Sequence, residues 1–200
     1  MTTLLQLNSS IFSSGGQSTR LADQFIVAWH ANQPETQVIV RDLAHDPIPH
    51  LDAQRVMAFF AQPEMRTPEQ QVFIDESDRL IEEISDAHIV VIGLPMYNFG
   101  IPSTLKAYFD QIARSGITFR YNDNGPEGLL TGKKVYVFAA RGGMYAGTPL
   151  DSQTSYVRDF LGFLGMNEVE FVYVEGLNMG ETAKETALAK AKLRLSALVA

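Results

Sequence analysis

The chain has 200 residues, of which 46% are hydrophobic and 20% charged, and this predicts a sizeable buried core rather than disorder. Its 16 Lys and Arg residues against 23 Asp and Glu residues give a formal net charge of −7. A nucleic-acid partner is therefore not expected, because phosphate backbones require clustered cations. With no cysteine in the sequence, disulfides, thiol nucleophiles and thiolate metal sites are excluded.

In chain order, short apolar runs alternate with segments of helical periodicity. Strands are predicted at residues 3–8, 38–40, 88–94, 135–139 and 169–174, and helices at residues 17–32, from Thr67 onward, and at 105–112, 157–165 and 188–198. Thr67, Pro68 and Gln70 have the pattern of a capping box, and Ser103 is expected to cap the next helix. Residues 43–68 contain four prolines and are expected to be irregular.

The apolar strand at 88–94 has no polar alternation, which indicates burial on both faces and therefore a parallel sheet. Residues 117–131 combine period-two alternation with turn-forming residues and predict a hairpin-like insertion. The order of elements predicts an α/β fold in one domain over residues 1–200, with a five-stranded parallel sheet and helices on both faces. A signal peptide and a membrane helix of ~20 residues are not expected, so we predict a cytoplasmic protein with no membrane partner.

Ligands of such sheets bind beyond the carboxyl ends of the strands, which points to the loops at 9–18, 95–102 and 140–150. The Gly-rich dinucleotide motif, the P-loop and the serine nucleophile elbow do not occur, and the four histidines lack the spacing of metal ligands. A Rossmann dinucleotide site, a P-loop triphosphate site, an α/β-hydrolase site and a metal site are therefore disfavoured.

Each of the three loops has a chemical interpretation and a plainer alternative. Hydroxyl and glycine residues at 9–18 precede a helix N-terminus and suit a phosphate monoester, or else form a solvated capping loop. The aromatic residues at 95–102 suit a flat ring, or else pack on their own fold. Amides of Gly142 and Gly143 suit the carbonyl oxygens of a heterocycle, or else belong to a flexible turn. Together the loops fit flavin mononucleotide (FMN) better than an adenine nucleotide.

Longer motifs carry a resemblance to a known family. Pro95 to Phe99 (Pro-Met-Tyr-Asn-Phe), with Leu105, Lys106 and Asp110, resembles the flavodoxin-like NAD(P)H:quinone reductases. A narrower resemblance to the FMN-dependent NADH:azoreductases rests on residues 41–43, 47–49, 118–121, 125–129, 131–134, 141–143 and 160–165. The resemblance spans the whole chain. It implies a flavodoxin-like fold with strand order 2-1-3-4-5, a non-covalent FMN, and a homodimer with its active sites at the interface.

The resemblance also implies which residues hold the FMN. They are Ser10, Gly16, Gln17 and Ser18 at the phosphate and ribityl chain, Met96, Tyr97, Asn98 and Phe99 at the isoalloxazine, and Arg141, Gly142 and Gly143 at its pyrimidine end. Hydroxyl residues are common in the family at the positions of Gly16 and Ala140, so the resemblance implies fewer side-chain donors to FMN in this chain.

The implied activity is that of an FMN-dependent oxidoreductase, in which hydride passes from NADH or NADPH through flavin N5 to a quinone. Two cycles would cleave an azo compound to amines, and a pocket shared by donor and acceptor would give ping-pong kinetics. The amides of Gly142 and Gly143 are expected to stabilise the anionic reduced ring, and no side chain is assigned as a catalytic acid. Selection of NADPH would require a cation placed to bind its 2′-phosphate. No residue of the sequence can be assigned to this task, so NADH and NADPH both stay candidates.

Tyr121, Phe163 and Phe60 are the candidate walls of a pocket for small aromatic acceptors. Phe163 has core packing as its alternative role. Residues 51–62 contain several apolar side chains. This segment is expected either to cap the pocket or to join the dimer interface, and its plainer alternative role is to cover the edge of the sheet. Two other functions stay open: an electron-carrier flavodoxin without an organic substrate, and a flavin-free signalling domain. The insertion and the apolar segment are superfluous to a carrier. A signalling domain would need acidic residues where this chain has Asn8-Ser9 and Pro95-Met96.

Overall fold

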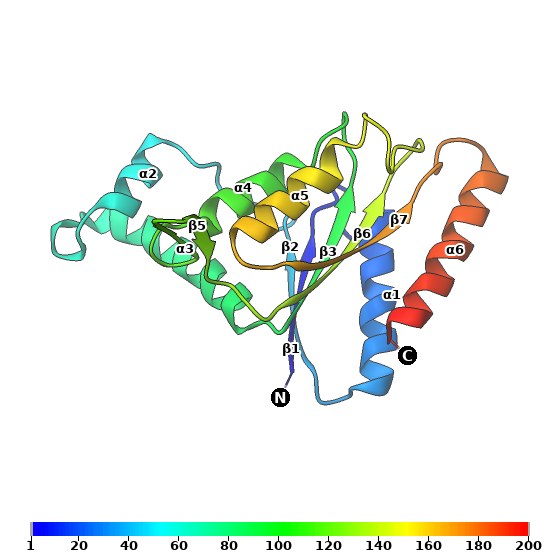
Figure 1. Cartoon of the computed structure of the whole chain (residues 1–200), viewed down its shortest axis with the longest axis horizontal. Helices are drawn as coiled ribbons and strands as arrows, with labels where there is room; N and C mark the ends of the chain where they lie inside the picture. Colours follow the sequence, from blue (N-terminus) through cyan, green and yellow to red (C-terminus); the bar gives the residue numbers. More distant parts are fainter. Residues whose placement is uncertain (1, 200) are drawn as a thin grey trace.

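The computed structural model describes residues 2–199 of the chain, which form a central parallel sheet between two layers of helices (Figure 1). The strands are β1 (Thr3–Asn8), β2 (Gln37–Asp42), β3 (Ile89–Pro95), β6 (Lys134–Ala140) and β7 (Glu168–Val174), with β4 (Phe119–Asn122) and β5 (Gly125–Gly128) in a separate hairpin. The helices are α1 (Gln17–Asn32), α2 (Ala53–Phe60), α3 (Pro68–Asp86), α4 (Ser103–Ile112), α5 (Ser152–Phe163) and α6 (Glu181–Val199), with 3-10 turns η1 (Ser13–Gly15) and η2 (Pro63–Met65).

The order of strands in the sheet is β2-β1-β3-β6-β7, and all four pairings are parallel. This confirms the predicted order 2-1-3-4-5, since β6 and β7 are the fourth and fifth strands of the sheet. The register pairs Asn8 with Gly93, Pro95 with Ala140, and Ala140 with Val174. The chain therefore leaves β1, β3, β6 and β7 at the same edge of the sheet.

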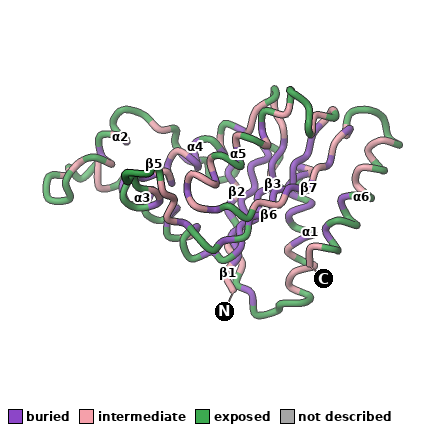
Figure 2. Tube along the Cα trace, in the orientation of Figure 1, coloured by how far each residue is buried: buried purple, intermediate pink, exposed green. Residues whose placement is uncertain are grey.

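Helices α1 and α6 cover one face of the sheet, and α3, α4 and α5 cover the other (Figure 1). On the first face, Leu21 and Phe25 of α1 share a core cluster with Leu195 of α6. The second face holds a larger cluster, to which each helix contributes; its members include Leu80, Ile84, Leu105, Phe109, Val157 and Leu161. Figure 2 shows the strands buried at the centre of the molecule, as the apolar run at 88–94 predicts.

The predicted insertion is a two-stranded antiparallel hairpin that docks on the end of α5. Gly128 lies so close to this end that a Cβ there would come within 2.0 Å of the amide nitrogen of Gly165. The ring of Phe119 packs on that of Phe163 with centroids 4.4 Å apart. Leu130 donates its amide to the carbonyl of Leu164. The hairpin is thus attached by close backbone contact and one aromatic pair.

Two local predictions are wrong. Residues 53–60, expected to be irregular, form helix α2, because Asp52 caps it by accepting from the Arg55 amide and the four prolines lie outside it. Ser103 does not cap α4 and is its first residue; Pro102 is the N-cap and has no side-chain cap bond. The capping box of Thr67 and Gln70 at α3 is confirmed.

Candidate functional site

The loops that follow β1, β3 and β6 meet at the carboxyl edge of the sheet and enclose a crevice. One part of it has a volume of about 430 Å³ and is lined by Ser10, Phe12, Gly15, Gly16, Gln17, Pro95, Met96, Tyr97, Ala140, Arg141, Gly142, Leu177, Asn178 and Lys184. An adjoining part of about 490 Å³ is lined by Met96, Asn98, Phe99, Gly142, Gly143, Tyr145, Asn178 and Met179. Cavities of this size accommodate small-molecule cofactors.

One end of the crevice lies at the N-terminus of α1. Its N-cap, Gly16, has no side chain with which to cap the helix. Within residues 2–199 the amides of Gln17, Ser18 and Thr19 donate no hydrogen bond, and the fully buried hydroxyl of Ser18 has no partner. Uncapped helix amides and the helix dipole together form a site for an anion.

Ser10 fills the space beside the N-terminus of α1. A Cβ at Gly16 would lie 2.2 Å from the Ser10 hydroxyl oxygen, so glycine is required at 16 with Ser10 in this position. The Ser10 hydroxyl accepts from the Phe12 amide at 3.2 Å and lies 3.3 Å from the Tyr97 hydroxyl. The hydroxyl of Ser10 therefore occupies the place of the side chain that Gly16 lacks.

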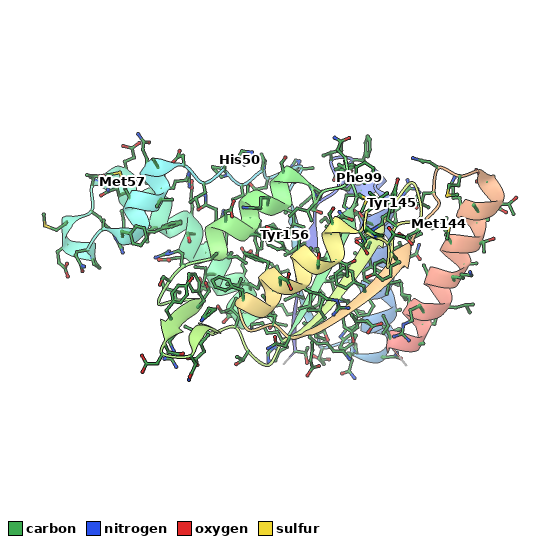
Figure 3. All side chains as sticks on the ribbon, turned by 45° about the horizontal axis from the view of Figure 1, so that its top comes forward. His50, Met57, Phe99, Met144, Tyr145 and Tyr156 are labelled. Carbon is green, nitrogen blue, oxygen red and sulfur yellow. The ribbon has the colours of Figure 1, made fainter. Side chains whose placement is uncertain are left out.

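A strained turn carries the aromatic wall of the crevice. Tyr97 and Gly100 exchange two backbone hydrogen bonds, of 3.1 and 2.9 Å, around Asn98 and Phe99, whose φ angles are +50° and +64°. This two-residue turn suits Asn followed by Gly, so a phenylalanine in the left-handed region costs about 1–2 kcal/mol. Phe99 is half exposed and packs edge-on against Tyr145, with ring centroids 5.6 Å apart (Figure 3).

Helix α5 holds this turn in place. The buried Gln153 side chain donates to the carbonyls of Pro95 and Gly100, both at 2.9 Å, and the Ser152 hydroxyl donates to the carbonyl of Phe99. The strain at Phe99 is therefore maintained by bonds from a neighbouring element. Local strain that the surrounding structure maintains in this way is typical of functional sites.

The loop after β6 presents backbone amides to the crevice. The carbonyls of residues 141, 142 and 143 all accept hydrogen bonds, from the amides of residues 177, 178 and 176 respectively, at 3.2, 2.9 and 3.0 Å. Within residues 2–199 the amides of Gly142 and Gly143 donate no hydrogen bond. With these carbonyls occupied, the free backbone group of each glycine is its N–H.

Arg141 lines the crevice beside Gly142, and two carboxylates hold its side chain inside the protein. Its side chain is fully buried and turned to Asp151 (2.8 Å) and Glu175 (3.2 Å), and its guanidinium lies over the Tyr173 ring. Glu175 also accepts from the amides of Tyr145 and Ala146, both at 2.8 Å. Arg141 thus ties the glycine loop to β7 and to α5.

The carboxylate of Asp151 is an ionised member of this network. Burial alone would raise the pKa of Asp151, but hydrogen bonds from Arg141 and from the hydroxyl and amide of Thr154 outweigh burial and hold the pKa below its ordinary value. Asp151 also caps α5 by accepting from the Thr154 amide at 3.1 Å. One ionised carboxylate therefore supports both the helix and the glycine loop.

These features fit FMN. The uncapped amides at the start of α1 suit its phosphate, and the free amides of Gly142 and Gly143 suit the carbonyl oxygens of its ring; Ser18 itself is fully buried and is not among the residues that line the crevice. Tyr97 supplies aromatic surface in the part of the crevice at α1, and Phe99 and Tyr145 supply it in the adjoining part.

Several lining residues were not among those expected from the sequence, namely Phe12, Tyr145, Leu177, Asn178, Met179 and Lys184. Four of these six residues, from Leu177 to Lys184, follow β7, and the sequence predicts ligand loops only after the strands at 3–8, 88–94 and 135–139. The apolar positions predict the last helix only from Leu188 onward, whereas α6 begins seven residues earlier, at Glu181. The sequence signal for this start is Gly180, directly before the helix; in the structure its φ is +101°, a conformation that favours glycine.

The candidate acceptor residues lie away from this crevice. Phe60 lines a second groove of about 430 Å³, with Leu51, Val56, Phe59, Arg66, Ala113, Arg114, Ser115, Ile117 and Phe119. Tyr121 and Phe163 both contact Phe119, at centroid distances of 5.9 and 4.4 Å. Figure 3 shows Met57 of α2 at the opposite end of the molecule from Phe99, Tyr145 and Met144. The three residues therefore share one region, and it is distinct from the crevice.

Within residues 2–199, no helix has both the length and the apolar character needed to span a membrane.

Comparison with known proteins places the chain among flavoproteins. A family model described as a flavodoxin-like fold matches residues 2–199. The chain is 57% identical over 197 residues to an FMN-dependent NADH:quinone oxidoreductase of Paraburkholderia phymatum, covering 98% of this chain and 100% of the relative. It is 53% identical to a protein of the same description from Cellvibrio japonicus, covering 96% of each. Among solved structures, an azoreductase from Bacillus anthracis superposes with a TM-score of 0.91 at 26% identity, covering 100% of this chain and 99% of that one.

Proposed function

We propose that this chain, which belongs to the flavodoxin-like family of FMN-dependent NADH:quinone oxidoreductases, carries electrons from a nicotinamide dinucleotide to quinones and azo compounds. It is an enzyme, and its cofactor is FMN. The observation that supports this proposal best is that the free amides of Gly142 and Gly143 and the uncapped N-terminus of α1 belong to one crevice.

Each part of the crevice has a defined task in this proposal. FMN, when bound, supplies the two-electron chemistry. The amides of Gly142 and Gly143 stabilise negative charge at the ring edge, because donors that are already oriented need no reorganisation. Asn98 and Phe99 position the ring from a turn that α5 holds rigid. No acid or base side chain is required.

Nicotinamide and acceptor use the same open aromatic face in turn, which gives ping-pong kinetics. A quinone is reduced in one cycle, and an azo bond is cleaved to two amines in two cycles. Two aromatic rings, Phe99 and Tyr145, and the side chains of Met96 and Met179 line one part of the crevice and offer surface on which a flat ring can stack. We therefore expect the enzyme to accept a range of flat aromatic substrates.

We further propose that the enzyme is a homodimer with its active sites at the interface. Two apolar surfaces of one chain support this. Phe60, which is 77% exposed, lines the second groove, and Met57 of the same helix and Tyr121 of the hairpin are 64% and 70% exposed; Phe12, which is 68% exposed, lines the crevice. In a two-fold dimer each groove can cover the partner's crevice, because both contacts are formed twice. Tyr121, Phe163 and Phe60 would then reach the acceptor pocket from the partner.

The decisive experiment is anaerobic mixing of the FMN-reconstituted protein with NADH and, separately, with NADPH. We expect the flavin absorbance to bleach with at least one donor and to return when a quinone or an azo dye is added, with amines released from the dye. Parallel double-reciprocal plots would support the ping-pong order. Absence of bleaching with either donor would contradict the enzyme function. Rapid transfer to a protein acceptor but not to quinones would favour the electron carrier instead.

The cytoplasmic location stays a prediction, and cell fractionation would test it.

A further inference from the structure

Lys184 lines the part of the crevice that includes the N-terminus of α1. It lines the same cavity as Gly15, Gly16 and Gln17, although it is more than 160 residues away in the sequence. It comes from the first turn of α6, whose N-terminus lies toward the same edge of the sheet as that of α1, while the two helices approach each other at their C-terminal ends (Figure 1). Of the two cationic residues that line this cavity among residues 2–199, the other is Arg141, which is held by Asp151 and Glu175.

The present partner of Lys184 is weak. Its ammonium group pairs with Glu181 at 3.1 Å, one turn earlier on the same helix, and the Glu181 side chain is 71% exposed. Exposed ion pairs of this spacing contribute little, because water screens them and both side chains lose freedom. A phosphate monoester carries close to two negative charges at neutral pH and attracts an ammonium group more strongly than one carboxylate does. The flexible four-carbon stem of lysine allows the change of partner.

We propose that Lys184 is the cationic partner of the FMN phosphate and leaves Glu181 when the cofactor binds. This inference rests on the proposed function, since it concerns the same crevice. The N-terminus of α1 supplies oriented neutral donors to the phosphate, and Lys184 supplies the charge that those donors lack. The affinity for FMN then depends on the phosphate group and on salt, and the affinity for riboflavin does not.

The test compares FMN with riboflavin, which differ by the phosphate group alone. Dissociation constants are measured by quenching of flavin fluorescence for the wild type, Lys184→Met and Lys184→Arg. We expect Lys184→Met to weaken FMN binding by about tenfold, to leave riboflavin binding unchanged, and to be rescued largely by Lys184→Arg. Lys192→Met, on an exposed position of the same helix, is the matched control and should change neither constant.

Two further measurements have predicted signs. Glu181→Gln frees Lys184 and should tighten FMN binding about twofold to threefold. Raising the salt concentration from about 20 to about 500 mM should weaken FMN binding to the wild type more than to Lys184→Met.

Four results would overturn the inference. Equal losses for FMN and riboflavin would mean that Lys184 acts through packing. Unchanged FMN binding in Lys184→Met would mean that the lysine does not reach the phosphate. A raised KM for NADH with an unchanged FMN dissociation constant would assign the lysine to the dinucleotide phosphates. If the wild type binds neither flavin, the proposed function fails along with the inference.

Discussion

Among individual residues, Phe99 shows most directly how the fold favours function over stability. Its φ of +64° is unfavourable for a residue with a side chain, and bonds from Ser152 and Gln153 maintain it. A glycine would satisfy the turn at lower cost but would remove the ring that faces Tyr145.

We therefore predict opposite effects for Phe99→Gly. Relief of the left-handed strain should raise the free energy of unfolding by up to about 1 kcal/mol, measured by urea denaturation of the apoprotein. Loss of the ring should weaken FMN binding about threefold to tenfold. Phe99→Leu keeps the strain and loses the ring, so it should weaken FMN binding without the gain in stability. A fall in stability for Phe99→Gly would show that the Tyr145 contact outweighs the strain.

Asp151 is the second residue whose role can be tested alone. Its folded-state pKa lies below the ordinary value, so its contribution to stability is present above pH ~4 and is lost as the pH falls through the folded pKa. Asp151→Asn should lower the free energy of unfolding at pH 7 by about 1–3 kcal/mol, because the buried Arg141 loses a charged partner.

The loss caused by Asp151→Asn should begin to shrink as the pH falls below about 4 and should vanish below the folded pKa, where the wild-type carboxylate is itself neutralised. Urea denaturation at several pH values measures it. Asp159→Asn, at an exposed position of the same helix, is the control and should stay within about 0.5 kcal/mol of the wild type. A loss for Asp151→Asn that does not depend on pH would mean that the carboxylate charge is not what stabilises the network.

Among the secondary-structure elements, the hairpin of β4 and β5 depends most on a single close contact. Gly128 allows the hairpin backbone to approach Gly165, and a Cβ there has no room because the nearest atoms belong to the backbone. Backbone atoms move less readily than the end of a side chain, so the hairpin must shift.

Gly128→Ala should accordingly lower the free energy of unfolding by about 1–3 kcal/mol, measured by urea denaturation. Gly162→Ala, in the nearby last turns of α5, is the matched control. Its nearest neighbour outside the helix is the Asn167 side chain at 3.4 Å, and alanine favours the helix, so stability should stay constant or rise. Equal effects of the two substitutions would contradict the role of the close contact.

The helices and strands themselves were largely predictable, for reasons that differ between elements. α1 matches residues 17–32 because Leu21, Ala22 and Phe25 form one apolar stripe that the sheet buries. The sequence does not predict α2 because the neighbouring prolines indicate irregular structure, although Asp52 is a typical N-cap residue. A short helix with half of its apolar side chains exposed leaves a weak pattern in the sequence.

In the whole molecule, two apolar surfaces lie at opposite ends of one chain, at the crevice and at the groove beside α2 (Figure 3). That residues 1–200 form a single domain stays a prediction. The distance between the two surfaces explains why Tyr121, Phe163 and Phe60 do not meet the crevice within one chain.

Phe60→Glu tests the proposed dimer. Phe60 is 77% exposed, so the substitution should hardly affect folding, but a buried charge at the interface should weaken dimerisation by about tenfold to a hundredfold. Sedimentation velocity over a range of concentrations measures it. Val27→Glu, at a residue of α1 that is 72% exposed, is the control and should leave the dimer unchanged. A wild-type chain that stays monomeric at high concentration, or a Phe60→Glu variant as dimeric as the wild type, would contradict the proposed interface.

The parallel sheet and the hairpin followed from the sequence by itself, because buried strands, helix faces and turn residues leave local patterns, whereas the strand order was implied by the resemblance to a known family. The burial of Arg141, the strain at Phe99 and the place of Lys184 in the same cavity as Gly16 were decided by the tertiary structure. Each depends on partners that are remote in the sequence, namely Glu175, Gln153 and Gly16. Contacts of this kind arise only when the sheet brings its carboxyl ends together, and no local pattern encodes them.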